Sequence, residues 1–188
     1  MIERESSLIP AVGIAPHKPT LGFVFSHPAH AIALGFGCGL LPRAPGTVAT
    51  LWAWLVFIVL QPHMTDAQWA ALLLASAVIG CWACTRSARE LGAADPSAIV
   101  WDEVLGFWCV LWLVTPSGFW AQLWAFALFR IFDIAKPGPV AWADALFKVQ
   151  RGEPIGWRQG FGILFDDLIA ALCALLVMRG LMLAVGSR

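Results

Sequence analysis

Long runs of apolar residues, separated by short polar or proline-containing stretches, dominate the chain after its first 25 residues. Runs of this length predict helices, and no alternation of short strands with helices is evident. The five predicted apolar segments are Val48–Leu60, Ala67–Cys84 with an extension to about Leu91, Ile99–Val114, Phe119–Ala135, and Phe161 to about Val185. Prolines mark two of the ends: Pro62 closes the first segment, and Pro137 closes the fourth because the residue before a proline disfavours helix.

The composition indicates that these helices lie in a membrane. The chain has 188 residues, of which 60% are hydrophobic and only 13% charged, with a mean hydropathy of +0.76. Soluble proteins average about 45–50% apolar and about 25% charged residues. We therefore predict an all-α fold, a polytopic membrane helical bundle with about four to five apolar helices. Several segments are shorter than the ~20 residues that span a bilayer, so the number of full crossings stays open, and a soluble all-helical oligomer is the alternative.

The chain divides into a flexible N-terminal tail, residues 1–25, and one membrane domain, residues 26–188. The tail contains Pro10, Pro16 and Pro19 and no continuous apolar run, so we expect no signal peptide. The formal net charge is zero, which gives no indication of a nucleic-acid partner. Cys81 and Cys84 have the spacing of a redox or metal pair, but within a helical run we expect them to be small buried hydrophobic residues.

The distribution of Lys and Arg predicts the orientation in the membrane. Loops 61–66 and 115–118 contain neither residue, whereas residues 1–43, 86–98 and 136–160 contain several. The positive-inside rule puts these basic regions in the cytoplasm and the two bare turns outside. The starts of the first, third and fifth segments and the end of the fourth then share the cytosolic face, where we expect the active site.

Two adjacent acidic pairs, Asp102-Glu103 and Asp166-Asp167, lie near the starts of apolar segments. An Asp at the centre of a membrane helix costs about 2.5–3.5 kcal/mol, so four carboxylates at this depth require a cation or the interface. We interpret both pairs as one metal site. Hard oxygen ligands without clustered His or Cys favour Mg²⁺ over zinc.

Arg130, Asp133 and Lys136 fall on one stripe of the fourth predicted helix, within an arc of about 120°. A metal ion held by carboxylates, with Arg130 and Lys136 nearby, suits a phosphate ester, because cations stabilise the charge that develops on the phosphoryl oxygens. A plain ion pair within the helix is the alternative. The nucleophile would be a water or an Asp, since no serine elbow is present.

The glycine- and proline-rich stretch from Gly35 to Thr47 predicts a tight, non-helical loop. Its G-x-G-x-G core resembles a nucleotide-binding loop, but such loops need a preceding strand and a following helix. We instead expect exposed backbone N–H groups that face an anion. Thr47 is predicted to be an N-cap or first-turn residue of the helix that follows.

Four linked motifs resemble those of the bacterial phosphatidylglycerophosphatase A family. They are His30 with the Gly35 to Thr47 loop, Ile99-Val100-Trp101-Asp102-Glu103 with Gly106, Phe129-Arg130-x-x-Asp133-x-x-Lys136-Pro137, and Gly160-x-Gly162-Ile163-x-x-Asp166-Asp167. They cover roughly residues 26–185 in the order of the family. Cys38 stands where the family often has Ser, so a hydroxyl group is not essential there.

The resemblance implies Mg²⁺-dependent hydrolysis of the terminal phosphate of phosphatidylglycerophosphate at the cytoplasmic side of a bacterial inner membrane. The expected catalytic carboxylates are Asp102, Glu103, Asp133, Asp166 and Asp167, of which Asp102, Glu103, Asp166 and Asp167 would bind the metal. The residues expected to bind the substrate phosphate are Lys136, Arg130, Thr47, Gly46 and His30. Arg43 falls at a variable position, which lowers the expectation that it binds phosphate.

The sequence lacks the motifs of two other phosphatase classes. The Ser-Gly-His motif of type-2 phosphatidic acid phosphatases is absent, and so is the Asp-x-Asp-x-Thr motif of haloacid dehalogenases. The alternative outside the enzymes is a membrane ion carrier, or a non-catalytic lipid- or phosphate-binding membrane protein. A carrier predicts carboxylates spread through the bilayer depth, whereas these cluster on one side. Acyl-chain preference and assembly into a homo-oligomer stay open.

Overall fold

The structure, a computed structural model, describes residues 18–148 and 154–186, and in this part of the chain every regular element is helical. The prediction of an all-α fold is confirmed. The elements are α1 (Leu21–Ser26), α2 (Pro28–Ala33), the 3₁₀ helix η1 (Gly35–Leu40), α3 (Pro45–Leu60), the 3₁₀ helix η2 (Gln61–His63), α4 (Asp66–Leu91), α5 (Trp101–Val114), α6 (Phe119–Ala135), α7 (Gly138–Leu146) and α8 (Trp157–Gly186).

The five predicted apolar segments correspond to α3, α4, α5, α6 and α8. Local sequence explains several of their ends. Thr65 and Gln68 form a reciprocal capping box at the start of α4, and Gly92 ends the same helix with a left-handed φ of 70°. α3 starts with Pro45 at its first position, where the missing N–H of proline costs nothing.

Three of these helices are long and apolar enough to cross a membrane, over Pro45–His63, Asp66–Leu91 and Trp157–Leu183. α5 has 14 residues and α6 has 17, which is fewer than the ~20 that cross a bilayer comfortably. The surface of the long helices is accordingly apolar: Leu55, Leu74 and Leu176 are each more than 60% exposed. Such side chains are suited to contact with lipid.

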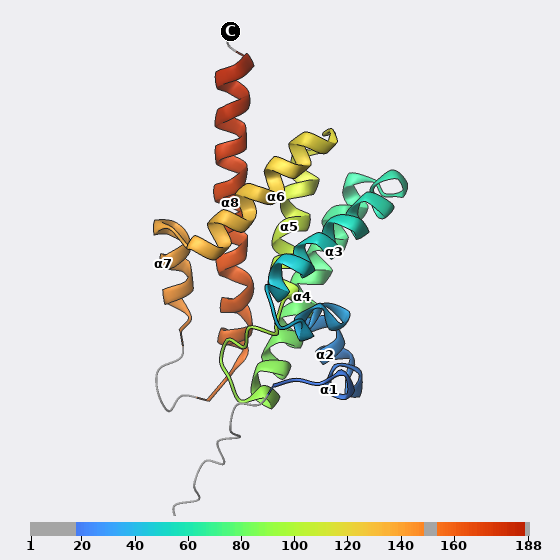
Figure 1. The fold of residues 1–188 in the computed structure, drawn as a ribbon, viewed down its shortest axis with the longest axis vertical. Helices are drawn as coiled ribbons and strands as arrows, with labels where there is room; N and C mark the ends of the chain where they lie inside the picture. Colours follow the sequence, from blue (N-terminus) through green and yellow to red (C-terminus); the bar gives the residue numbers. More distant parts are fainter. Residues whose placement is uncertain (1–17, 149–153, 187–188) are drawn as a thin grey trace, which may run out of the picture.

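α8 packs against four other helices, α4, α5, α6 and α7. Figure 1 shows it as the longest element, with α6 crossing it and its C-terminal part extending beyond its neighbours. α5 packs between α3 and α8 and contributes much of the core. Small side chains occupy many of the contacts, because alanines are fully buried on several helices. These include Ala49, Ala53, Ala83, Ala170 and Ala174.

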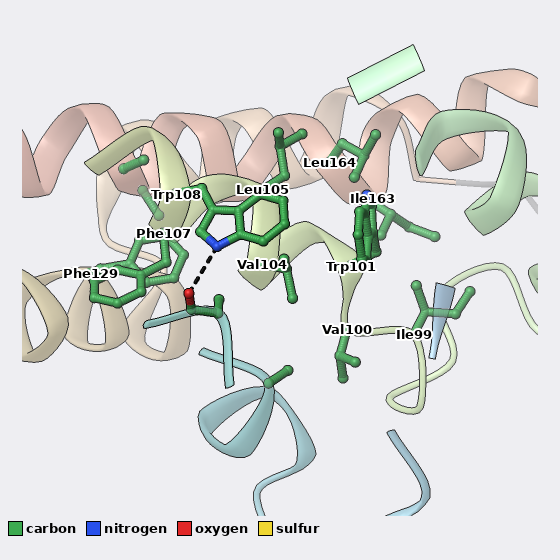
Figure 2. Packing of buried hydrophobic residues seen from close by; sticks show 14 of the residues in the cluster. Ile99, Val100, Trp101, Val104, Leu105, Phe107, Trp108, Phe129, Ile163 and Leu164 are labelled. Carbon is green, nitrogen blue, oxygen red and sulfur yellow. Dashed lines mark hydrogen bonds between the residues drawn. The ribbon is translucent and has the colours of Figure 1, made fainter. Parts of the chain in front are cut away.

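Two buried tryptophans of α5 bind carbonyl groups of neighbouring helices. The Trp108 indole N–H donates to the Ala53 carbonyl of α3 at 2.9 Å, the bond drawn in Figure 2. The Trp101 indole N–H donates to the Ser76 carbonyl of α4 at 3.1 Å. A buried indole N–H needs such a partner, so these bonds fix α5 against both neighbours.

Two regions differ from the sequence-based expectation of loops. The Gly35 to Thr47 stretch contains the 3₁₀ helix η1, interrupted at Phe36 and Gly37 by positive φ angles of 54° and 111°. Residues 138–146, predicted to belong to a loop, form helix α7, which has a proline in its first turn. Of the predicted tail, residues 1–17 lie outside the described residues, and Leu21–Ser26 form α1, with Val24 fully buried.

Candidate active site

A cavity of about 400 Å³ lies where the start of α3, the start of α5, the end of α6, α7 and the first half of α8 come together. Its lining includes the two predicted acidic pairs, Asp102-Glu103 and Asp166-Asp167. It also includes Gly46, Thr47, Arg130, Asp133 and Lys136. Except for His30, all the residues predicted for the site therefore surround one space.

Three carboxylates in this cavity form a compact cluster. Asp102, Glu103 and Asp167 each offer one oxygen atom, and these three oxygens lie within 4.8 Å of one another. Asp102 Oδ1, Glu103 Oε2 and Asp167 Oδ2 are buried and have no hydrogen-bond partner among the described residues. Buried, unpaired carboxylate oxygens are costly unless a cation compensates them, and hard oxygen donors suit Mg²⁺. The residues present therefore fit a divalent cation.

Two glycines make room for close packing around the carboxylate cluster. A Cβ atom on Gly106 of α5 would lie 3.2 Å from the Asp167 carbonyl of α8 and 3.0 Å from the Phe129 ring, so the glycine lets these helices pack closely. A Cβ atom on Gly46 would lie 1.9 Å from Glu103 Oε1. A larger residue at this position would therefore displace the end of the Glu103 side chain from its place beside the start of α3.

Arg130 connects the acidic cluster to α6. Its Nη1 atom lies 3.7 Å from Glu103 Oε1, donates to Asp133 Oδ2, and lies 3.5 Å from Thr50 Oγ1. The Arg130 and Asp133 side chains are 11% and 13% exposed. Asp133 therefore pairs with Arg130 one turn earlier on the helix, and this pair holds the guanidinium group beside the carboxylates.

Lys136 lies just beyond α6, in a left-handed conformation with a φ of 41°. This turn directs it away from Asp133: its Nζ atom donates to Asp144 Oδ1 of α7 at 2.7 Å and to Asp166 Oδ2 of α8 at 2.5 Å. Partial burial alone would lower the pKa of Lys136, but the bonds to the two carboxylates outweigh it and raise this pKa. The ammonium group therefore stays charged.

Asp144 accepts from both Lys136 and Lys148. Partial burial acts to raise the pKa of Asp144, but the hydrogen bonds from these two lysines outweigh it and lower this pKa. The two neighbouring residues of the second acidic pair consequently have different surroundings. Asp166 pairs with Lys136, whereas Asp167 belongs to the compact carboxylate cluster.

The first turn of α3 also faces the cavity, through Pro45, Gly46 and Thr47. Thr47 is a first-turn residue, as expected, and Ala44 precedes the helix with a left-handed φ of 48°. The first N–H groups of a helix have no carbonyl partner within it and lie at the positive end of its dipole. Together with Arg130 and Lys136, this helix start makes part of the cavity suitable for an anion.

His30 does not line the cavity. It lies on α2, fully buried, and both ring nitrogens interact with α4: Nδ1 lies 2.9 Å from Ser87 Oγ and Nε2 lies 2.9 Å from Glu90 Oε2. The Phe23 ring stacks on it with a centroid distance of 4.1 Å. In this position His30 joins the N-terminal helices to α4, and the structure does not bring it to the predicted phosphate-binding residues.

Five polar residues that were not among the predicted site residues also line the cavity, namely Asp95, Ser97, Asp144, Lys148 and Gln159. Asp144 and Lys148 are four residues apart, and the Pro137-Gly138-Pro139 start preceding them is a helix signal that would have placed both on one face. Asp95 follows the end of α4 in a loop, and no local pattern in the sequence separates it from an ordinary solvated carboxylate.

Comparison with known proteins agrees with the family resemblance of the sequence motifs. The model of the family described as phosphatidylglycerophosphatase A matches residues 31–182. The chain is 35% identical over 81% of its length to a phosphatidylglycerophosphatase A from Haemophilus influenzae, of which 87% is covered. It is 34% identical to the Escherichia coli phosphatidylglycerophosphatase A, over 78% of this chain and 79% of that one. It is also 35% identical to a putative phosphatidylinositol-3-phosphatase from Bacteroides thetaiotaomicron, over 78% of this chain and 89% of that one. No solved structure matches significantly.

Proposed function

The chain belongs to the phosphatidylglycerophosphatase A family, and from this membership we propose that it hydrolyses the terminal phosphate monoester of phosphatidylglycerophosphate to phosphatidylglycerol and inorganic phosphate. The observation that carries the proposal is the cluster of Asp102, Glu103 and Asp167, whose unpaired oxygens share one cavity with Arg130 and Lys136. Carboxylates that hold a cation, beside two fixed cationic side chains, are suited to a phosphate dianion.

The proposed cofactor is Mg²⁺, held by Asp102, Glu103 and Asp167. When bound, it would polarise the phosphoryl group and favour deprotonation of an attacking water. Asp166 contributes differently, by holding Lys136 at the cavity. The proposed set of metal ligands is therefore smaller than the four carboxylates expected from the sequence, because Asp166 binds Lys136 instead.

The side chains of the protein supply binding and charge stabilisation. Arg130, Lys136 and the first turn of α3 neutralise the phosphoryl oxygens, whose negative charge redistributes as the bond from phosphorus to the glycerol oxygen breaks. The oxygen of the water forms the new bond to phosphorus, the glycerol oxygen leaves with one proton of that water, and the other proton stays on the released phosphate. Asp133 keeps the Arg130 guanidinium group oriented during this step.

We propose a multi-pass location in a bacterial inner membrane, with the cavity at the cytoplasmic face. The three long apolar helices support the membrane location. The distribution of Lys and Arg supports the orientation, because loops 61–66 and 115–118 contain neither residue. Ion carriage is less consistent with the cavity, since its carboxylates gather at one site and do not form a path.

Phosphate release from detergent-dispersed phosphatidylglycerophosphate, measured with and without Mg²⁺, tests the proposal. Phosphatidylinositol 3-phosphate is the comparison substrate, because one relative is named for a phosphatase that acts on it. We expect release from phosphatidylglycerophosphate that depends on Mg²⁺ and is abolished by EDTA. Faster release from phosphatidylinositol 3-phosphate would overturn the substrate assignment, and undiminished release in EDTA would overturn the cofactor assignment.

A further inference from the structure

A second cavity, of about 660 Å³, lies between α4 and α8. It is separate from the active site, because it contacts the opposite face of α8. Phe161, Leu164 and Leu168 of α8 line this groove, whereas Gly162, Ile163 and Asp166 line the active-site cavity. No residue in the described part of the chain lines both cavities.

The groove has a charged end and an apolar end, which follows from the way α4 and α8 run past each other. A Cβ atom on Gly160 of α8 would meet Thr85 of α4, and one on Gly80 of α4 would lie 3.6 Å from Leu164 of α8. The helices are therefore antiparallel here. Arg86 and Arg89 lie near the start of α8, and Ala77 and Val78 lie farther along it, toward Leu164 and Leu168.

The positive charge at this end is only partly balanced. Arg86 pairs with Glu90 at 3.1 Å, and Glu90 also contacts His30. Arg89 donates its Nε–H to the Ile155 carbonyl at 2.5 Å, and it has no carboxylate partner within 4.0 Å among the described residues. Among the described residues, Arg86 therefore has one carboxylate partner and Arg89 has none, which leaves the groove entrance with excess positive charge.

The dimensions fit one leaflet of a bilayer. From Arg89 to Ala77 the groove follows twelve residues of α4, which is about 18 Å at 1.5 Å per residue. The hydrocarbon core of a membrane is about 30 Å thick, so each leaflet contributes about 15 Å. Trp157 lines the groove near its charged end and Trp82 lines its middle, and tryptophan is enriched where headgroups meet hydrocarbon.

We propose that this groove binds an anionic diacyl phospholipid, with the headgroup phosphate at Arg86 and Arg89 and the acyl chains along Ala77, Val78, Leu164 and Leu168. The charge at one end favours an anionic headgroup over a zwitterionic one, and the apolar remainder favours acyl chains over a free phosphate ion. The site is independent of the proposed catalytic function, since it uses none of the residues of the active-site cavity.

Native mass spectrometry of the full chain tests this proposal. The protein, purified in a neutral detergent, is mixed with equal amounts of phosphatidylserine and phosphatidylcholine that carry the same acyl chains. Phosphatidylserine is anionic and has no phosphate monoester. We expect wild-type protein to retain phosphatidylserine in preference to phosphatidylcholine by roughly tenfold, because each arginine contributes to attraction of an anionic headgroup.

Three variants identify the site. The double substitution Arg86→Gln and Arg89→Gln is expected to abolish the preference, and Arg86→Lys with Arg89→Lys is expected to keep most of it. Arg179→Gln is the matched control, because Arg179 is exposed near the other end of α8 and lies outside the groove. It should retain the wild-type preference. Circular dichroism and thermal unfolding check that each variant is folded.

Several results would overturn the proposal. One is equal retention of both lipids by the wild type, and another is an unchanged preference in the folded Gln double variant. Loss of phosphatidylserine from Lys136→Met, with retention in the double variant, would assign the lipid to the active-site cavity. Lipid-free dimers that dissociate when the double variant is introduced would assign the groove to a second copy of this chain.

Discussion

The Lys136 ammonium group lies 2.5 Å from Asp166 Oδ2, and this contact joins the residue after α6 to the first half of α8. The adjacent residue, Asp167, instead contributes to the carboxylate cluster with Asp102 and Glu103. Two neighbouring aspartates of one helix thus take part in different interactions. Their separate roles lead directly to the first prediction.

Asp167→Asn and Asp166→Asn are expected to have different effects. Asp167→Asn removes an anion that a hard cation requires, so activity should fall by about 100-fold or more, and stabilisation by added Mg²⁺ should disappear. The apo protein should be as stable as wild type or more stable, because like charges no longer repel. Asp166→Asn should lose activity through Lys136 but keep the Mg²⁺ response. Thermal unfolding with and without Mg²⁺ measures the stability and the Mg²⁺ response of each variant, and phosphate release measures its activity. Equal Mg²⁺ responses in the two variants would contradict the assignment.

Lys136→Met is expected to lower both activity and stability. The substitution leaves Asp144 without one partner and Asp166 without its cation, and an unpaired buried carboxylate costs more than the ~1–3 kcal/mol of an unsatisfied neutral group. Lys148→Met is the matched control, because Lys148 also pairs with Asp144 but its side chain is 69% exposed. Its unfolding free energy should change by less than about 1 kcal/mol. Chemical unfolding measures stability and phosphate release measures activity. A Lys136→Met variant as stable as wild type would show that these ion pairs do not contribute to the stability of the fold.

Gly46→Ala is expected to inactivate the enzyme by displacing Glu103. The added Cβ atom would lie 1.9 Å from Glu103 Oε1, so the carboxylate must leave its present position in the cluster with Asp102 and Asp167. Mg²⁺-dependent phosphate release should fall by at least about tenfold. Gly180→Ala on α8 is the control, since no atom lies within 4 Å of its added Cβ. Wild-type activity in Gly46→Ala would contradict the requirement for close approach.

His30 predicts a pH dependence of stability. Burial lowers the pKa of His30 below its usual value near 6.5, although the hydrogen bond with Glu90 acts in the opposite direction. The unfolded chain therefore binds more protons than the folded one just below pH 6.5. Stability from neutral His30 is fully present above this pH and is lost as the pH falls through the folded-state pKa.

The measurement is the thermal midpoint between pH 7.5 and 5. Because Gln does not titrate, His30→Gln should show a smaller decrease in this range than wild type. His63→Gln provides the control, since His63 is exposed whereas His30 is fully buried. A decrease in His30→Gln as large as that of wild type would assign the dependence to other groups.

The orientation is tested with cysteines introduced at Lys148 and Gly118, in a background without the five native cysteines. Gly118 lies at the start of α6 and Lys136 immediately after its end, and 17 helical residues separate them by about 25 Å. A membrane-impermeant thiol reagent should label Gly118→Cys from the outside and Lys148→Cys only in inverted vesicles. If both cysteines were labelled from the same side, the proposed location of the cavity at the cytoplasmic face would be wrong.

The sequence predicted the five apolar helices well because several of their ends have a local cause. Pro62 and Pro137 follow α3 and α6, and the turn at Pro116 separates α5 from α6. The charged pairs were also informative, since carboxylates beside apolar segments need a shared compensation. Asp102, Glu103 and Asp167 do lie together, although 64 residues separate the second from the third along the chain.

The partners of Lys136 and His30 could not be predicted in the same way. The sequence placed Arg130, Asp133 and Lys136 on one stripe of a helix, but the left-handed turn after α6 directs Lys136 to Asp144 and Asp166. His30 lies beside Ser87 and Glu90, 57 and 60 residues away. Such contacts depend on how the helices pack in three dimensions, which cannot be predicted from the spacing of residues along the chain.

The buried alanines of α3, α4 and α8 determine what holds these helices together in a bilayer. Lipid tails are as apolar as leucine side chains, so removing leucine from lipid yields little of the driving force that water would provide. Dispersion between closely spaced backbones and hydrogen bonds such as that from Trp108 to Ala53 supply the cohesion instead. The carboxylate cluster is therefore held by short distances between helix axes, and an added methyl group at an interface alanine would disturb it more than removal of a lipid-facing leucine.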